Sequence, residues 1–74
     1  AWKKRIVELL PTNSKTRETI AVRGKYFMVE KEPRVHPEHG MIITLYDDDQ
    51  YRFSTSVRNI RFPQPDEFKD LAGL

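Results

Sequence analysis

The segment from His36 to His39, H-P-E-H, is the first place where residue types favour chemistry. Two imidazoles and the carboxylate of Glu38 are groups that bind Zn²⁺. In a helical zinc motif both imidazoles project from one face of the helix, but here Pro37 stands between them and interrupts any helix. We therefore expect an ordinary solvent-exposed loop here and predict no metal site.

Three consecutive carboxylates, Asp47 to Asp49, form the second candidate for a metal site. Carboxylate oxygens are ligands of Mg²⁺ and Ca²⁺, but a calcium loop also needs staggered ligands, an interior glycine and a distant bidentate glutamate. This segment has none of these features. Aspartate is common in turns because its side chain bonds to the local backbone. The segment thus predicts a hairpin turn.

Groups for covalent catalysis or cofactor binding are missing from the chain. There is no cysteine, and no serine lies in a G-x-S-x-G elbow. A phosphate-binding loop needs several glycines close together, whereas Gly24, Gly40 and Gly73 are far apart. A chain of this size also has little room for a deep substrate pocket. We predict no catalytic residue, no cofactor and no small-molecule substrate, and hence no enzymatic activity.

Basic residues offer the better functional candidates, because an arginine side chain binds phosphate or carboxylate with two parallel bonds. Alternation turns Arg52 outward. In a closed five-stranded barrel we expect five basic residues to converge into one stripe: Arg23, Lys25, Arg52, Arg58 and Arg61. Tyr26 or Tyr46 among them would stack on nucleic-acid bases. Against this, outward charges ordinarily serve solubility, and acidic residues such as Glu30 and Glu32 interrupt the positive field.

Large apolar residues near both ends of the chain are candidates for contact with a partner protein. Trp2 either closes one end of the fold or anchors a partner, since tryptophan is favoured at interface hot spots. Phe68 and Leu71, three residues apart, either cover an open end of the fold or contact a partner.

The elements that must position these residues are predicted from alternation with a period of two, which is typical of strands. Val7 and Leu9 share one face of the first strand, and Tyr51 and Phe53 share one face of a hairpin. Gly24 marks a bend and Pro33 and Pro37 mark an irregular stretch. The predicted strands cover residues 4–10, 17–23, 25–31 and 61–62 and the hairpin 41–55; residues 32–40 are irregular, a 3₁₀ turn falls within 56–60, and a short helix follows in 66–74.

This order of elements resembles that of SH3-like small barrels, an architecture that Tudor, KOW and chromo-type domains share. The resemblance covers about residues 4–62 and concerns the strand pattern, because no family motif accompanies it. It implies a mainly β fold: a five-stranded, partly open SH3-like antiparallel barrel with a short C-terminal helix. Fold likeness of this kind carries no function by itself.

Length and composition set further limits. A chain of 74 residues forms one domain, here a β-barrel domain over 1–63 followed by an acidic helix or tail over 64–74. The absence of cysteine excludes disulfides and suits a reducing compartment, and no segment has the roughly 20 apolar residues that span a bilayer. We therefore expect a cytoplasmic protein that makes no membrane contact.

Charge is unevenly distributed along the chain. Three acids and one lysine give the segment 66–74 a charge of −2, so the total of +2 leaves +4 on the remainder. A domain this small buries only about 60% of its unfolded surface and gains stability by docking onto something larger. The sequence therefore indicates a non-enzymatic protein-interaction module, such as a regulator, an accessory subunit or a viral structural protein, or one that forms homo-oligomers. The alternative is a nucleic-acid-associated module that binds phosphates through the basic stripe.

Overall fold

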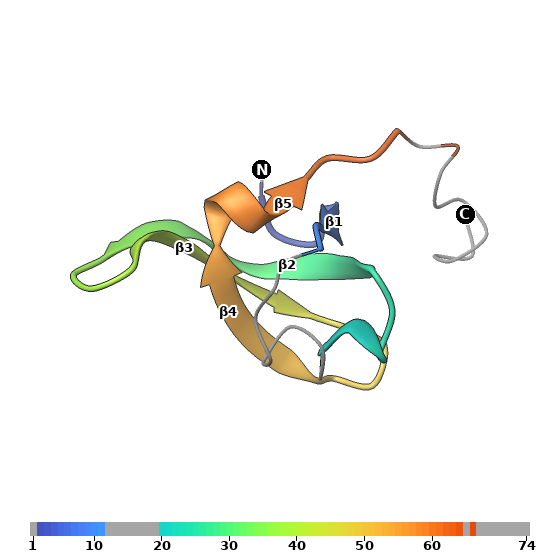
Figure 1. The fold of residues 1–74 in the computed structure, drawn as a ribbon. Coiled ribbons are helices and arrows are strands. Elements are labelled where there is room, and N and C mark those ends of the chain that lie inside the picture. Colours follow the sequence, from blue (N-terminus) through green and yellow to red (C-terminus); the bar gives the residue numbers. More distant parts are fainter. Residues whose placement is uncertain (1, 12–19, 65, 67–74) are drawn as a thin grey trace.

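Five antiparallel strands form one sheet in the computed structural model, which describes residues 2–11, 20–64 and 66. The order of strands across the sheet is β4-β3-β2-β1-β5 (Figure 1). The elements are β1 (Ile6–Leu9), β2 (Tyr26–His36), β3 (Gly40–Tyr46), β4 (Arg52–Ser56), the 3₁₀ turn η1 (Val57–Asn59) and β5 (Ile60–Arg61).

The hairpin of β3 and β4 confirms the alternation expected from the sequence. Leu45 pairs with Phe53, and their side chains face the core, whereas Arg52 and Ser54 are exposed on the other face. The same alternation places Val7 and Leu9 of β1 in the core. Apolar residues at alternate positions of strands rich in β-branched and aromatic residues thus give the sheet one buried face.

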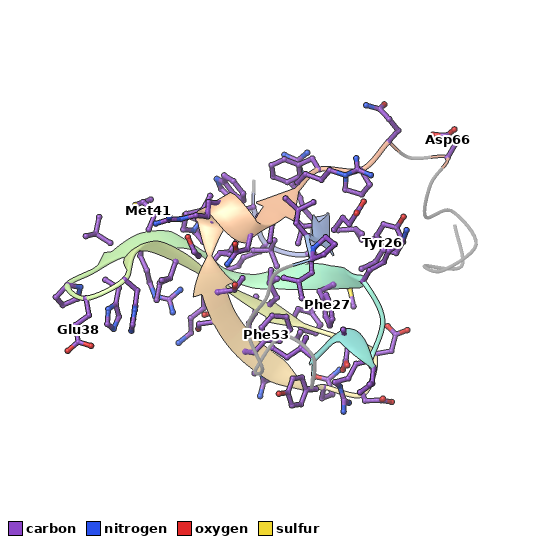
Figure 2. All side chains as sticks on the ribbon, in the orientation of Figure 1. Tyr26, Phe27, Glu38, Met41, Phe53 and Asp66 are labelled. Carbon is purple, nitrogen blue, oxygen red and sulfur yellow. The ribbon has the colours of Figure 1, made fainter. Side chains whose placement is uncertain are left out.

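The core lies on the concave side of the curved sheet. Phe27 and Phe53 meet there edge to face, with ring centroids 4.9 Å apart and an interplanar angle of 85°. Figure 2 shows these two rings inside the curve of the sheet. The buried residues of this hydrophobic core are Val7, Leu9, Ile20, Phe27, Val29, Ile43 and Leu45. Each large side chain of this kind contributes about 1.5–3 kcal/mol by burial.

A single 3₁₀ turn joins the two edge strands of the sheet. The hydroxyl of Ser56 accepts a hydrogen bond from the N–H of Arg58 and so caps η1. The chain then enters β5, where Arg61 pairs with Glu8 of β1. Because only three residues connect opposite edges, the sheet is strongly curved. No ladder joins β4 to β5 within the described residues, so the sheet is open.

The strand expected over 17–23 is wrong in its described part. Ile20 and Ala21 have helical backbone, and the N–H groups of Arg23 and Gly24 donate to the carbonyls of Ile20 and Ala21, 2.9 and 3.1 Å away. Ile20 is buried while Val22 is 86% exposed, so alternate residues do not share an environment as they would in a strand. Residues 12–19 lie outside the described residues.

The irregular stretch expected over 32–40 is also wrong, because β2 continues to His36. Register shifts interrupt the ladder between Val29 and Lys31, before Pro33, and again between Lys31 and Arg34, an interval that contains Pro33. Such bulges leave residues unpaired, so the strand tolerates a proline that has no N–H to donate. The resulting β2–β3 arm (residues 34–42) projects from the body of the sheet (Figure 1).

Two further expectations concern the chain ends and membranes. The helix predicted over 66–74, with Phe68 and Leu71, lies outside the described residues except for Asp66. Within the described part of the chain, no helix has the length and apolarity needed to cross a membrane.

Candidate functional site

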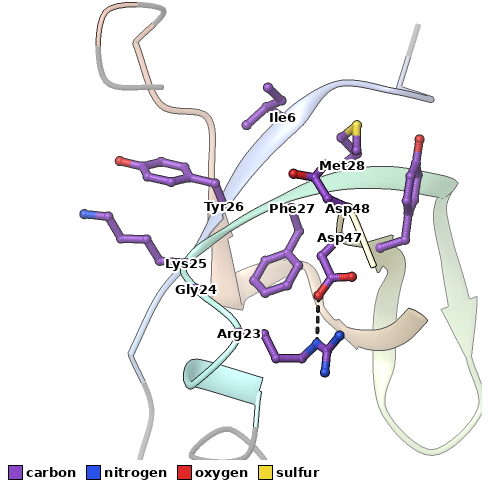
Figure 3. Close-up of a pocket in the computed structure, with 10 residues that line it drawn as sticks. Ile6, Arg23, Gly24, Lys25, Tyr26, Phe27, Met28, Asp47 and Asp48 are labelled. Carbon is purple, nitrogen blue, oxygen red and sulfur yellow. Dashed lines mark hydrogen bonds and ion pairs between the residues drawn. The ribbon is translucent and has the colours of Figure 1, made fainter. Parts of the chain in front are cut away.

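A hollow of about 190 Å³ opens where the loop 23–25 faces the turn between β3 and β4 (Figure 3). Its rims come from two parts of the chain that are distant in sequence. The residues that line it are Ile6, Arg23, Gly24, Lys25, Tyr26, Phe27, Met28, Tyr46, Asp47 and Asp48. We call this feature the hollow.

The apolar wall of the hollow follows from strand register. Met28 of β2 pairs with Ile6 of β1 on one side and with Tyr46 of β3 on the other, so the three side chains form one row across the outer face of the sheet. Tyr26 lies two residues before Met28 on the same face. All four are half-buried. This face therefore presents apolar and aromatic surface where an outward face is ordinarily polar.

An ion pair ties the two rims of the hollow together. Arg23 Nε donates to Asp47 Oδ2 over 2.7 Å, and its Nη2 lies 3.3 Å from Asp49 Oδ2. The guanidinium also sits 4.3 Å above the ring of Tyr51. We call these four residues the clasp. It fixes the loop that carries Lys25 to the turn that carries Asp48.

Asp47 has a second role, which is to hold the hairpin turn itself. Its Oδ1 accepts hydrogen bonds from the N–H groups of Asp49 and Tyr51, each 3.0 Å away. Partial burial raises the pKa of Asp47, but the bonds from Arg23 and from the backbone outweigh this, so the pKa lies below the ordinary 3.8. The pKa of Arg23 is raised, chiefly by its hydrogen bond to Asp47.

The two rims carry opposite charges. Lys25 Nζ lies 5.2 Å above the ring of Tyr26 on one rim. Asp48 is exposed on the other rim, and no cationic group of the described chain forms an ion pair with it. A ligand in the hollow would therefore meet an ammonium group on one side and a carboxylate on the other.

The stripe of basic residues expected from the sequence is largely paired with acids. Arg52 forms an ion pair with Glu30, Arg61 with Glu8, and Arg23 with Asp47. Arg58 donates through Nε to its neighbour Ser56 over 3.2 Å. Lys25 belongs to the rim of the hollow. The structure thus neutralises three of the five residues and does not leave a continuous positive stripe.

Trp2 packs against the core and lies 5.3 Å from Phe62, measured between ring centroids. Arg5 lies 4.2 Å above the ring of Phe62. Trp2 is half-buried in this cluster. Phe68 and Leu71, the other apolar candidates, lie outside the described residues.

The histidines of the H-P-E-H segment lie in the turn of the arm and stack on each other. The ring centroids of His36 and His39 are 4.7 Å apart at 29°, and the N–H of Glu38 donates to His36 Nδ1 over 3.1 Å. Across residues 2–11, 20–64 and 66, no three His, Asp or Glu side chains gather as they would to hold a metal ion.

The arm carries an exposed apolar pair that the sequence reasoning missed. Val35 pairs with Met41, and the two side chains are 78% and 46% exposed. Met41 lies on the same face of β3 as Ile43 and Leu45, so the core face of the sheet continues onto the arm. The available signal was the hydrophobic V-x₅-M spacing, which makes a cross-strand pair once a turn is placed at Pro37–His39.

Comparison with known proteins gives no relative. No family model matches the chain, and neither a curated protein nor a solved structure matches it significantly.

Proposed function

We propose that this chain is a non-enzymatic protein-interaction module that docks onto a larger assembly through its β2–β3 arm. The observation that carries the proposal is the exposed pair of Val35 and Met41 at the end of a projecting hairpin. Apolar side chains that continue a core face into solvent are typical of surfaces that another protein covers.

The proposal includes the type of fold. The strand order β4-β3-β2-β1-β5, with a 3₁₀ turn between β4 and β5, supports a partly open SH3-like barrel. The short helix after Pro65 is part of the proposal on the sequence pattern alone. A small barrel of this kind serves as a regulator, an accessory subunit or a viral structural piece when a partner supplements its limited core. A second copy of the chain is the simplest such partner.

A matched pair of variants tests the docking role of the arm. The double variant Val35→Ser/Met41→Ser removes the exposed pair, while Val22→Ser removes a valine that is 86% exposed elsewhere on the molecule. Sedimentation of the pure protein and quantitative pull-down from its native cells should show association that Val22→Ser retains and the arm variant loses. A protein that stays monomeric and retains nothing in an arm-dependent manner contradicts the proposal.

Nucleic-acid binding through the basic stripe is the weaker alternative, because Glu8, Glu30 and Asp47 pair with its arginines. We expect fluorescence titration with single- and double-stranded oligonucleotides to show no saturable binding at low salt. Binding that weakens steeply with salt would reverse the ranking of the two functions.

A further inference from the structure

The hollow is a second candidate binding surface, separate from the arm. Its wall is apolar, with Ile6, Met28 and Tyr46 in one row of the outer face. Its volume of about 190 Å³ is comparable to that of one large side chain. Two tyrosine rings line it, and such rings combine a large apolar contact area with a hydroxyl that bonds at the rim.

We propose that the hollow binds an extended segment of a partner protein in which one large apolar residue is flanked by an acidic residue on one side and a basic residue on the other. The apolar side chain enters the hollow between Tyr26 and Tyr46. The segment's acid faces Lys25, and its base faces Asp48.

Charge complementarity selects this ligand. Of the three consecutive aspartates, Asp47 and Asp49 are engaged by Arg23, which leaves Asp48 as the carboxylate that meets a ligand. Lys25 stands on the opposite rim. A segment with two acids or two bases would place one of its charges against a like charge, and such placement lowers affinity.

The hollow is formed before any ligand arrives. The clasp joins its rims through the 2.7 Å bond from Arg23 to Asp47, and the backbone bonds to Asp47 Oδ1 fix the turn next to Asp48. A preorganised site loses little conformational entropy on binding, which makes even a short segment able to bind.

Synthetic tripeptides test the proposal directly on the full chain. Acetyl-Glu-Phe-Lys-amide and its reverse, acetyl-Lys-Phe-Glu-amide, cover both chain directions. The comparison peptides replace phenylalanine with alanine or carry two glutamates or two lysines. In a ¹⁵N-labelled sample we expect saturable shifts of the backbone amides of Gly24, Lys25, Tyr26 and Asp48 with one of the two mixed-charge peptides, at a dissociation constant on the order of 1 mM.

Charge reversal at the rims supplies the decisive control. Asp48→Lys should make the peptide with two glutamates the preferred ligand, and Lys25→Glu should favour the peptide with two lysines, each by about two- to fivefold. Both positions are exposed, so an unchanged dispersion of the other amide signals verifies the fold.

Equal binding of the alanine peptide, absence of shifts at the hollow, or a charge preference that ignores both reversals overturns the proposal. The experiment uses no partner of the arm, so its result is independent of the docking role proposed for Val35 and Met41.

Discussion

The two hairpin turns of the β2–β3–β4 meander are held in different ways. In the turn after β3, Asp47 accepts two backbone hydrogen bonds and an ion pair from Arg23, a residue 24 positions away. In the turn after β2, the bonds are local: the N–H of Glu38 donates to His36, and His39 stacks on His36.

The difference shows which surface of each hairpin is available for contact with a partner. Long-range side-chain contacts fix the first turn to the body and leave a shaped hollow between them. The second turn stands at the end of a ladder whose apolar pair, Val35 and Met41, is 78% and 46% exposed. One surface is suited to receiving a side chain, and the other is suited to entering or covering a partner.

The largest expected difference between the region of the hollow and the arm is in stability. Phe27 lies under the hollow, is 2% exposed and contacts Phe53, so Phe27→Ala should lower the free energy of unfolding by about 3–5 kcal/mol. Val35→Ala on the arm should change it by less than about 0.5 kcal/mol. Urea unfolding measures both values. If Phe27→Ala fails to fold, the milder Phe27→Leu provides the comparison. Equal losses of stability at Phe27 and at Val35 would contradict the expected difference.

A smaller difference is expected between the stability costs of substituting Gly24, beside the hollow, and Gly40, in the arm. Gly24, beside the clasp, has φ +118°, and Gly40, at the base of the turn in the arm, has φ +74°. An added Cβ meets no atom at either position, so the cost is that of the backbone conformation alone. Gly24→Ala should cost about 1–3 kcal/mol.

At Gly40 the backbone is close to the left-handed region that asparagine tolerates. Gly40→Ala should therefore cost about 1 kcal/mol and Gly40→Asn less. Thermal unfolding of the three variants gives the order, and a larger loss at Gly40 than at Gly24 would show that the turn of the arm is the more constrained one.

The smallest expected effect is the pH dependence contributed by the clasp. The pKa of Asp47 in the folded protein lies below 3.8, so its stabilising contribution is complete above about pH 4 and is lost as pH falls through the folded value. Asp47→Asn should flatten the fall of the urea midpoint between about pH 4 and pH 2. Asp48→Asn, at the exposed neighbour, is the control, and an equal flattening by both variants would remove the assigned role of Asp47.

Much of the sheet could be predicted from the sequence because its signals are local. Alternation at Tyr51 and Phe53 and the acidic turn before them define the β3–β4 hairpin, and Ser56 before Val57 provides the cap of the 3₁₀ turn. The strand over 17–23 was wrong for a local reason as well: Ile20 and Val22 alternate in type, yet turn hydrogen bonds place one inside and the other outside.

The candidate site was less predictable because it depends on register between distant strands. The sequence shows that Arg52 and Arg61 point outward, but only the ladders bring Glu30 and Glu8 beside them. Likewise Ile6, Met28 and Tyr46 share a face only after β1, β2 and β3 are paired. The arm was missed because Pro33 ordinarily ends a strand, and the bulge that accommodates it has no signal of its own in the sequence.

The pairing of β5 with β1 has a consequence for the order of assembly. Glu8 and Arg61 come from nearly opposite ends of the described chain, whereas β2, β3 and β4 follow one another directly. Pairing of segments that are distant in sequence costs more chain entropy, so we expect the consecutive hairpins to form early and β5 to join late. During synthesis on a ribosome β5 emerges after β1, β2, β3 and β4, and until it arrives the outer edge of β1 stays open to pairing with a strand from another chain.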